Sequence, residues 1–262
     1  TQGQTTIVEP APTRDHTENI LSAFGAQISI EASGLGNAIT LTGQPEFQAR
    51  EIKIPGDISS AAFPLVAALI TPGARITIEN VGLNPLRTGL LDTLVEMGAK
   101  IKITNNRTAT GETVGDISAK CSSLQGIRVP LERVPRMIDE YPILAVAAAC
   151  AEGITVFEGV SELRLKESDR LSAIVEGLTV CQVKVQETED SLTIIGEGKP
   201  PLGGGYIATN LDHRIAMAFL VLGMATAKSI TVDDSSAIDT SFPGFEKFMN
   251  GLGADLRVGV ER

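Results

Sequence analysis

Three charged stretches of this sequence could carry chemistry. One is the triplet Asp212-His213-Arg214, which opens an otherwise apolar stretch that ends at Ala227. Asp212 is explained as a helix N-cap, because a carboxylate there accepts hydrogen bonds from free backbone N–H groups. Arg214 is not explained in this way, because a cation in the first helical turn opposes the helix dipole. We therefore expect a negative group beside Arg214, and this group need not belong to the protein.

The second stretch is Lys-Glu-Ser-Asp-Arg at residues 166–170. Lys166 and Arg170 are four residues apart, so we expect them to share one helix face. Like charges on one face repel each other unless an anion lies between them. Taken alone, such a stretch is more often a solvated helix start with mixed charges, so both interpretations stay open here.

The third stretch is Asp139-Glu140, at the start of an apolar helix. If this helix start and that of Arg214 converge, backbone N–H groups and arginine side chains form an anion site. Asp139 is then a carboxylate in a positive field, which stays ionised and can serve as a base. His213 lies in the same region, and so we regard it as a possible supporting residue. A lone histidine beside Asp and Arg, such as His213 or His16, is more often structural than catalytic.

Composition limits the possible partners. The chain has 262 residues, of which 43% are hydrophobic, enough for a large core in one or two domains. Its net charge of −10 argues against bulk attraction to nucleic acid or anionic membrane. No apolar run reaches the roughly 20 residues that a membrane span needs. Three scattered cysteines lack metal-ligand spacing and indicate reduced thiols. We expect a cytoplasmic protein without metal, nucleic acid or membrane partner.

An internal repeat indicates the architecture. Nearly identical strand-like triplets begin at Ile76, Ile154 and Ile230. Each follows an Ala-rich apolar helical stretch, and each precedes an amphipathic helix and a further strand. The unit therefore reads helix, strand, helix, strand, strand. Its period of about 77 residues is too long for a common solenoid and favours one α/β domain of three pseudo-equivalent units.

The N-terminal residues hold a fourth copy of only the second half of this unit. Residues 14–31 match the amphipathic helix and strand, with Gly25 as the helix C-cap. Gly98 and Gly253 are the expected caps in two other units, whereas Gln182 in the middle unit predicts a different cap. Because a half-unit cannot bury a core alone, we expect the chain to begin inside a unit whose preceding part lies elsewhere. The alternative is a degenerate extension of an intact protein.

Together these motifs resemble the 5-enolpyruvylshikimate-3-phosphate (EPSP) synthase family. The resemblance covers essentially the whole chain and is closest to the C-terminal three-fifths of bacterial class II members. It rests on the stretches "RDHTE", "MIDEYPILAVAAA", "ELRLKESDRL", "LDHRIAMAF" and "DDSSAIDTSFPGF". It implies the enolpyruvyl transferase fold, an inside-out α/β barrel of repeated βαβαββ-type units with pseudo-threefold symmetry. It also implies that residues 1–54 are the final piece of an N-terminal, shikimate-phosphate domain, and residues 55–262 a complete C-terminal domain of three repeats.

The family moves the enolpyruvyl group of phosphoenolpyruvate onto the 5-hydroxyl of shikimate 3-phosphate and releases phosphate, without a cofactor. The resemblance implies shikimate 3-phosphate ligands Arg14, Asp139 and Lys166, and phosphoenolpyruvate ligands Glu167, Arg170 and Arg214. It further implies that Asp139 takes the hydroxyl proton and that Glu167 handles the methylene proton. The family's N-terminal phosphate-binding residues have no counterpart here. We therefore expect the N-terminal fragment of the same enzyme as a partner, and an inactive chain without it.

Two departures from the family pattern favour the class II interpretation. Many class I members have Asn at the position of Glu162 and Lys at the position of Thr240. One alternative is the sister transferase that acts on UDP-N-acetylglucosamine with a reactive cysteine, but no cysteine here lies in such a loop. Another alternative is a non-catalytic subunit of the same fold. Degraded site charges would favour that alternative, and the charges here are intact.

Overall fold

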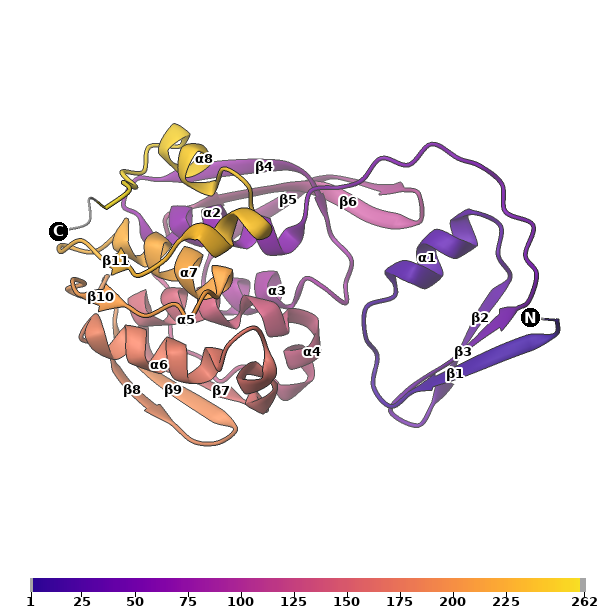
Figure 1. The fold of residues 1–262 in the computed structure, drawn as a ribbon, viewed down its shortest axis with the longest axis horizontal. Coiled ribbons are helices and arrows are strands. Elements are labelled where there is room, and N and C mark those ends of the chain that lie inside the picture. Colours follow the sequence, from indigo (N-terminus) through magenta and orange to yellow (C-terminus); the bar gives the residue numbers. More distant parts are fainter. Residues whose placement is uncertain (1, 260–262) are drawn as a thin grey trace.

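The computed structural model describes residues 2–259. The N-terminal part forms one antiparallel sheet of order β1-β3-β2 with a single helix, from β1 (Gln4–Glu9), α1 (His16–Ala23), β2 (Ile28–Ser33) and β3 (Gly36–Thr42). Figure 1 shows this sheet and α1 at one end of the molecule, away from most of the other helices. An extended segment then leads to the repeats.

The first two repeats have the same sheet topology. The first consists of α2 (Ile58–Ile70), β4 (Arg75–Gly82), α3 (Gly89–Glu96), β5 (Lys100–Ala109) and β6 (Glu112–Lys120), with the antiparallel order β4-β6-β5. The second consists of α5 (Tyr141–Cys150), β7 (Glu152–Glu158), α6 (Arg170–Val180), β8 (Lys184–Glu187) and β9 (Ser191–Glu197), with the antiparallel order β7-β9-β8. The predicted order of helix, strand, helix, strand, strand is confirmed in both.

Short helices lead into the second repeat and follow its first strand. They are η1 (Leu131–Arg133), α4 (Val134–Met137) and η2 (Ile138–Glu140) before α5, and η3 (Ser161–Leu165) before α6. The third repeat contains β10 (Tyr206–Ile207), α7 (His213–Gly223), β11 (Thr231–Val232), η4 (Ser236–Thr240) and α8 (Phe245–Gly251). Here β10 pairs in parallel with β11.

The strand predicted after α8 is not formed among residues 254–259. In the other repeats the strand after the second helix pairs with a middle strand, β6 or β9, rather than with the first strand. The described part of the third repeat supplies no such middle strand. The segment after α8 therefore has no ladder to join, although its sequence suits a strand.

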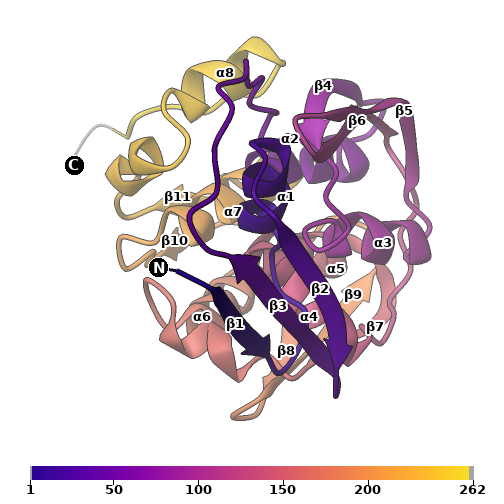
Figure 2. The same cartoon turned by 90° about the vertical axis from the view of Figure 1, so that its right-hand side faces the viewer.

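The three apolar helices α2, α5 and α7 form the centre of the molecule, where they pack against one another. All ten residues of α5 are buried, as expected for a helix that is apolar on every side. Figure 2, turned by 90°, shows the N-terminal sheet in front of these helices and the strands of the repeats around them. Between residues 2 and 259, no helix is long and apolar enough to span a membrane.

The amphipathic helices end in the same way in all four copies of the half-unit. The cap residues Gly25, Gly98, Gln182 and Gly253 have φ of 103°, 92°, 67° and 105°. Each donates its N–H to the carbonyl three residues before it, and the next N–H reaches the carbonyl five residues before. The prediction of a different cap at Gln182 is therefore wrong. A non-glycine residue takes the left-handed conformation there, at a cost of about 1 kcal/mol.

Candidate active site

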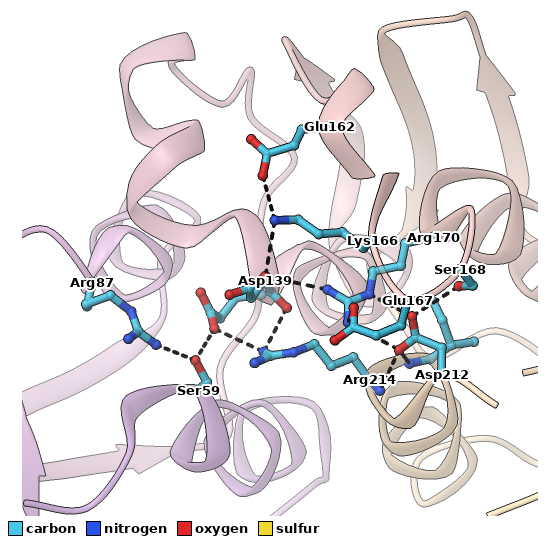
Figure 3. A network of polar contacts seen from close by, with 12 residues as sticks. Ser59, Arg87, Asp139, Glu162, Lys166, Glu167, Ser168, Arg170, Asp212 and Arg214 are labelled. Atoms are coloured by element: carbon cyan, nitrogen blue, oxygen red, sulfur yellow. Dashed lines mark hydrogen bonds and ion pairs between the residues drawn. The ribbon is translucent and has the colours of Figure 1, made fainter. Parts of the chain in front are cut away.

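The starts of α2, α5 and α7 converge, as the sequence predicted. Arg214, in the first turn of α7, donates from Nη1 to the carbonyl oxygen of Asp139 at 3.0 Å and to Oε1 of Glu140 at 3.3 Å. Ser59, in the first turn of α2, donates from Oγ to the same Oε1 at 2.5 Å. Figure 3 shows side chains from the three repeats meeting there. The negative group expected beside Arg214 is therefore present in the protein itself.

Asp139 lies at the centre of a group of cations. Its Oδ2 accepts a hydrogen bond of 2.6 Å from Nη2 of Arg14, which comes from the N-terminal part. Its Oδ1 lies 3.5 Å from Nη1 of Arg170 and 3.7 Å from Nζ of Lys166. Burial acts to raise the pKa of Asp139, but the hydrogen bond from Arg14 and the charges of Arg214, Arg14 and Lys166 outweigh it, and the pKa is lowered. Asp139 is therefore ionised and has the electrostatic setting of a base.

Lys166 and Arg170 do not lie on one helix face, and that expectation is wrong. Lys166 follows the 3-10 turn η3 in an extended conformation, residues 166–168 form a bend, and Arg170 is the first residue of α6, after its N-cap Asp169. Lys166 forms an ion pair of 2.5 Å with Glu162. The two cations still approach one anion, because both lie within 4 Å of Oδ1 of Asp139. The site therefore combines them through tertiary structure rather than through helical spacing.

The buried cation Arg170 is held by Asp212, whose role beyond helix capping the sequence did not reveal. Nε of Arg170 donates to Oδ2 of Asp212 at 2.7 Å, and both side chains are fully buried. Asp212 also accepts from the backbone N–H groups of Arg214 and Ile215, as predicted for an N-cap. Burial acts to raise the pKa of Asp212, but the Arg170 contact and the capping hydrogen bonds lower it. One carboxylate therefore fixes both the start of α7 and Arg170.

Glu167 lies at the edge of the same group. Its half-exposed side chain accepts a hydrogen bond of 2.5 Å from Nη2 of Arg170. His213 follows Asp212 in the first turn of α7, where burial and then the charge of Arg214 lower the pKa of its imidazole, so it is neutral at neutral pH. His16 has a different partner, since its Nδ1 contacts Oε1 of Glu112 on β6 at 2.7 Å. That contact joins the N-terminal part to the first repeat.

Sequence reasoning missed two further residues of the site, Arg87 and Ser59. Nη2 of Arg87 donates to Oγ of Ser59 at 2.7 Å and lies 3.7 Å from Oδ1 of Asp57. Arg87 lies two residues before the second helix of its repeat, as Arg14 does before α1, whereas Arg170 is the first residue of α6. Aligning the repeats on their helix caps would therefore have indicated Arg87.

Glu140 also belongs to this site and differs sharply from its neighbour Asp139. Burial, assisted by the charge of Asp139, raises the pKa of Glu140, although Ser59, Arg214 and Arg87 act to lower it. Among the described residues, its buried Oε2 has no hydrogen-bond partner. Two adjacent carboxyl groups thus have pKa values shifted in opposite directions, an arrangement that is frequent in active sites.

Other parts of the described chain offer less chemistry. Residues 2–259 contain no cluster of side chains that could hold a metal ion. Cys150 and Cys181 are buried, and burial raises the pKa of their thiols to about 12 and about 11, so neither is a thiolate at neutral pH. A groove of about 990 Å³ lies along α7, β11, η4 and α8, but no residue of the charged site lines it.

Comparisons with known proteins agree on one family. The model of the family described as EPSP synthase (3-phosphoshikimate 1-carboxyvinyltransferase) matches residues 1–249. A 3-phosphoshikimate 1-carboxyvinyltransferase of Rhodospirillum rubrum is 55% identical over 257 residues, which cover 98% of this chain and 57% of the relative. One from a Chelativorans species is 57% identical over 259 residues, which cover 98% of this chain and 58% of the relative.

Solved structures show the same relation. An EPSP synthase from Acinetobacter baumannii superposes with a TM-score of 0.92 at 45% identity, covering 97% of this chain and 57% of that one. The enolpyruvyl transferase NikO from Streptomyces tendae has a TM-score of 0.72 at 20% identity, covering 98% of this chain and 57% of that one, and shows a shared fold only. The chain thus spans less than three-fifths of the length of these relatives.

Proposed function

Because the chain belongs to the EPSP synthase family and has the enolpyruvyl transferase fold, we propose that it is the C-terminal part of a 3-phosphoshikimate 1-carboxyvinyltransferase. This enzyme transfers the enolpyruvyl group of phosphoenolpyruvate to the 5-hydroxyl of shikimate 3-phosphate and releases phosphate. The observation that carries the proposal is the group of four cations around the ionised Asp139. Both substrates are polyanions, and in a chain of net charge −10 these cations form a local anion site.

The cations divide between the two substrates. Arg170 and Arg214, on the first turns of α6 and α7, are the proposed ligands of phosphoenolpyruvate, together with Glu167. Arg14 and Lys166, which also contact Asp139, are the proposed ligands of shikimate 3-phosphate. Without substrate, protein carboxylates neutralise these cations, and the substrate anions would take over part of that role. His213 is a supporting residue at most, because its imidazole is uncharged.

The two proposed proton-transfer groups are Asp139 and Glu167. Asp139 accepts the proton of the 5-hydroxyl while the hydroxyl oxygen bonds to C2 of phosphoenolpyruvate, and Glu167 delivers a proton to the methylene carbon. A proton of the resulting methyl group then returns to Glu167 as the C–O bond to phosphate breaks, which restores the double bond and releases phosphate. Fixed cations stabilise the negative charge that collects on the departing phosphate.

The partner of this chain is, in our proposal, the N-terminal part of the same enzyme in the cytoplasm. Residues 1–54 would complete its shikimate-phosphate domain, and residues 55–262 would form the C-terminal domain. The support is the exposed apolar surface of the half-unit, where Ile7, Val8, Ile30 and Leu35 are largely uncovered. A sheet and one helix cannot bury such side chains by themselves. The site also needs closure from a second domain to exclude water and orient two substrates.

The test combines this chain with the N-terminal portion of the Rhodospirillum rubrum relative that the chain does not cover. Phosphate release is measured with both substrates, with each substrate alone, and for the chain alone. We expect release only from the assembly supplied with both. An assembly that forms but releases phosphate only with UDP-N-acetylglucosamine as acceptor would favour the sister transferase. An assembly that binds both substrates without turnover would indicate a non-catalytic subunit, and either result refutes the proposal.

A further inference from the structure

Glu140 is a buried carboxylate that neither proton transfer in the proposed reaction uses. It follows Asp139 in the chain, yet its exposed fraction is only 1%. Its Oε1 accepts hydrogen bonds from Oγ of Ser59 at 2.5 Å and from Nη1 of Arg214 at 3.3 Å. These partners come from the first and third repeats, and Glu140 itself comes from the second. A single oxygen atom thus joins all three repeats.

The contacts continue beyond Ser59. Oγ of Ser59 also accepts from Nη2 of Arg87 at 2.7 Å, and Arg87 lies 3.7 Å from Oδ1 of Asp57. Asp57 in turn caps α2, because its side chain accepts from the backbone N–H groups of Ser59 and Ser60. We call Asp57, Arg87, Ser59 and Glu140 the Glu140 network. It extends from a helix cap in the first repeat to the guanidinium of Arg214.

The Glu140 network has an energetic cost that packing does not explain. Burying a carboxyl group with one oxygen that has no hydrogen-bond partner among the described residues costs about 1–3 kcal/mol or more. An apolar side chain would fill the same volume without this cost. The hydrogen bonds that Oε1 accepts from Ser59 and Arg214 must therefore compensate for this cost. Without Oε1, Nη1 of Arg214 keeps, among residues 2–259, only the hydrogen bond to the carbonyl oxygen of Asp139.

We propose that Glu140 is a positioning residue that fixes the guanidinium of Arg214 in the orientation in which it meets phosphoenolpyruvate, and that Ser59 and Arg87 fix Glu140. The identity of the anion rests on the proposed function. The orientation of Arg214 does not, because it depends only on contacts within the chain. A cation that is held in place before the substrate arrives needs no reorganisation during the reaction.

Two substitutions separate the position of the oxygen from its charge. Glu140→Gln keeps the side-chain length and an acceptor oxygen but removes the charge. Glu140→Asp keeps the charge but withdraws the oxygen from Ser59 and Arg214 by one methylene group. The matched control is Glu96→Gln, which removes the charge of a carboxylate that pairs with Arg133 on the outside of the first repeat. All variants are made in the assembled enzyme.

The expected result is a change in the KM of one substrate. Glu140→Asp should raise the KM of phosphoenolpyruvate by about ten- to hundredfold, because a displaced binding group costs this much, with the KM of shikimate 3-phosphate little changed. Glu140→Gln should change this KM less than Glu140→Asp does, and Glu96→Gln should stay near the parent. Ser59→Ala, which frees Glu140, should change the same KM in the same direction as Glu140→Asp. A crystal structure of Glu140→Asp should show the Arg214 guanidinium displaced.

The opposite results overturn the inference. If Glu140→Gln raises the KM of phosphoenolpyruvate while Glu140→Asp leaves it near the parent, the charge and not the position of the oxygen matters. If both KM values rise together, Glu140 has only a structural role. An inactive parent assembly refutes the proposed function instead. In that case the crystal structure still decides the inference, since an unmoved Arg214 in Glu140→Asp contradicts it and a displaced Arg214 supports it.

Discussion

The N-terminal half-unit and the repeat domain contain the same kind of helix in opposite surroundings. None of the eight residues of α1 is buried, whereas five of the eight residues of α3 are. Both helices end in the same left-handed cap, at Gly25 and Gly98. The difference lies in what covers them, since α3 belongs to a repeat that also contributes a central apolar helix. Local structure in this protein therefore forms from local sequence, but burial requires a complete unit.

Polar contacts join the two regions. Arg14 contacts Asp139, His16 contacts Glu112, and Asp15 accepts a hydrogen bond of 2.6 Å from Asn84. Partly exposed pairs of this kind contribute only about 0–1 kcal/mol each. The N-terminal half-unit is thus connected to the repeats by polar contacts, of which Arg14–Asp139 also belongs to the candidate site, and much of its apolar surface stays exposed. Substitutions in the two regions should consequently have different kinds of effect.

The largest effect is expected at the two proposed proton-transfer groups of the repeat domain, Asp139 and Glu167. Asp139→Ala and Glu167→Gln should each reduce turnover of the assembled enzyme by about 100- to 10,000-fold. Asp139→Ala should also weaken shikimate 3-phosphate binding in calorimetry, whereas Glu167→Gln should keep it. Exchange of the methylene protons of phosphoenolpyruvate with solvent provides a second measurement. Normal exchange in Glu167→Gln would show that another residue moves that proton.

The next largest contrast between the two regions is expected in the free energy of unfolding. Asp212→Ala leaves the fully buried Arg170 without its main partner and uncaps α7, so it should cost about 3–5 kcal/mol in the free energy of unfolding. Asp15→Ala, in the N-terminal half-unit, should cost less than about 1 kcal/mol, because its contact with Asn84 is partly exposed. Urea unfolding of both variants measures this difference. Equal losses would contradict the contrast between a buried core and an exposed attachment.

A smaller contrast between the two regions is expected in substrate affinity, where each variant should affect one substrate. Arg214→Ala should weaken phosphoenolpyruvate binding by about 2–5 kcal/mol, because a desolvated cation that contacts the anion is lost. Arg14→Ala, at a more exposed position, should weaken shikimate 3-phosphate binding by less. The KM of each substrate, measured separately for the two variants, checks the assignment. A loss of shikimate 3-phosphate affinity alone in Arg214→Ala would mean that the two subsites are exchanged.

The smallest expected effect is a pH dependence of stability at Glu140. Its pKa is raised above 4.5 by burial and by Asp139, against Ser59, Arg214 and Arg87, so the folded state binds its proton more tightly than the unfolded state. Its contribution to stability is therefore present in acid and is lost as the pH rises through the folded pKa. Glu140→Gln should be more stable than the parent at pH 8, and this advantage should disappear in acid. Urea midpoints across the pH range measure it.

The control for this pH effect has the opposite sign. The hydrogen bond and charge of Arg133 lower the pKa of Glu96, although slight burial opposes them. Glu96→Gln should therefore lose a little stability at neutral pH, and the loss should shrink as the pH falls through the folded pKa. A stability gain in Glu96→Gln like that in Glu140→Gln would mean that the gain is a general effect of removing negative charge from this acidic chain.

Much of the fold was predictable because its signals are local. The three-unit period, the apolar helices and the glycine caps each depend on residues close together in the chain, and the family match and the TM-score of 0.92 confirm the predicted family and fold. The helix-dipole argument about Arg214 also predicted an anion beside it. The prediction of a strand after α8 was wrong because a strand needs a neighbouring strand to pair with. The sequence of the segment itself cannot show whether that neighbour exists.

What the sequence did not reveal concerns tertiary contacts. Asp212 was interpreted as a cap, and its pairing with Arg170 depends on how α6 and α7 meet. Lys166 and Arg170 were assigned to one helix face because their spacing allowed it, whereas a 3-10 turn and a bend intervene. Such contacts follow from tertiary packing, which periodicity does not determine.

The converging helix starts also affect how a polyanion reaches the site. The chain has a net charge of −10, so at low ionic strength its surface repels an approaching polyanion. At physiological ionic strength, charges more than about 8 Å apart are largely screened from one another. Over the last few ångströms the local cations Arg14, Lys166, Arg170 and Arg214 dominate the field. Capture therefore depends on short-range contact rather than on long-range steering, and moderate salt should speed the diffusional encounter before higher salt weakens the bound state.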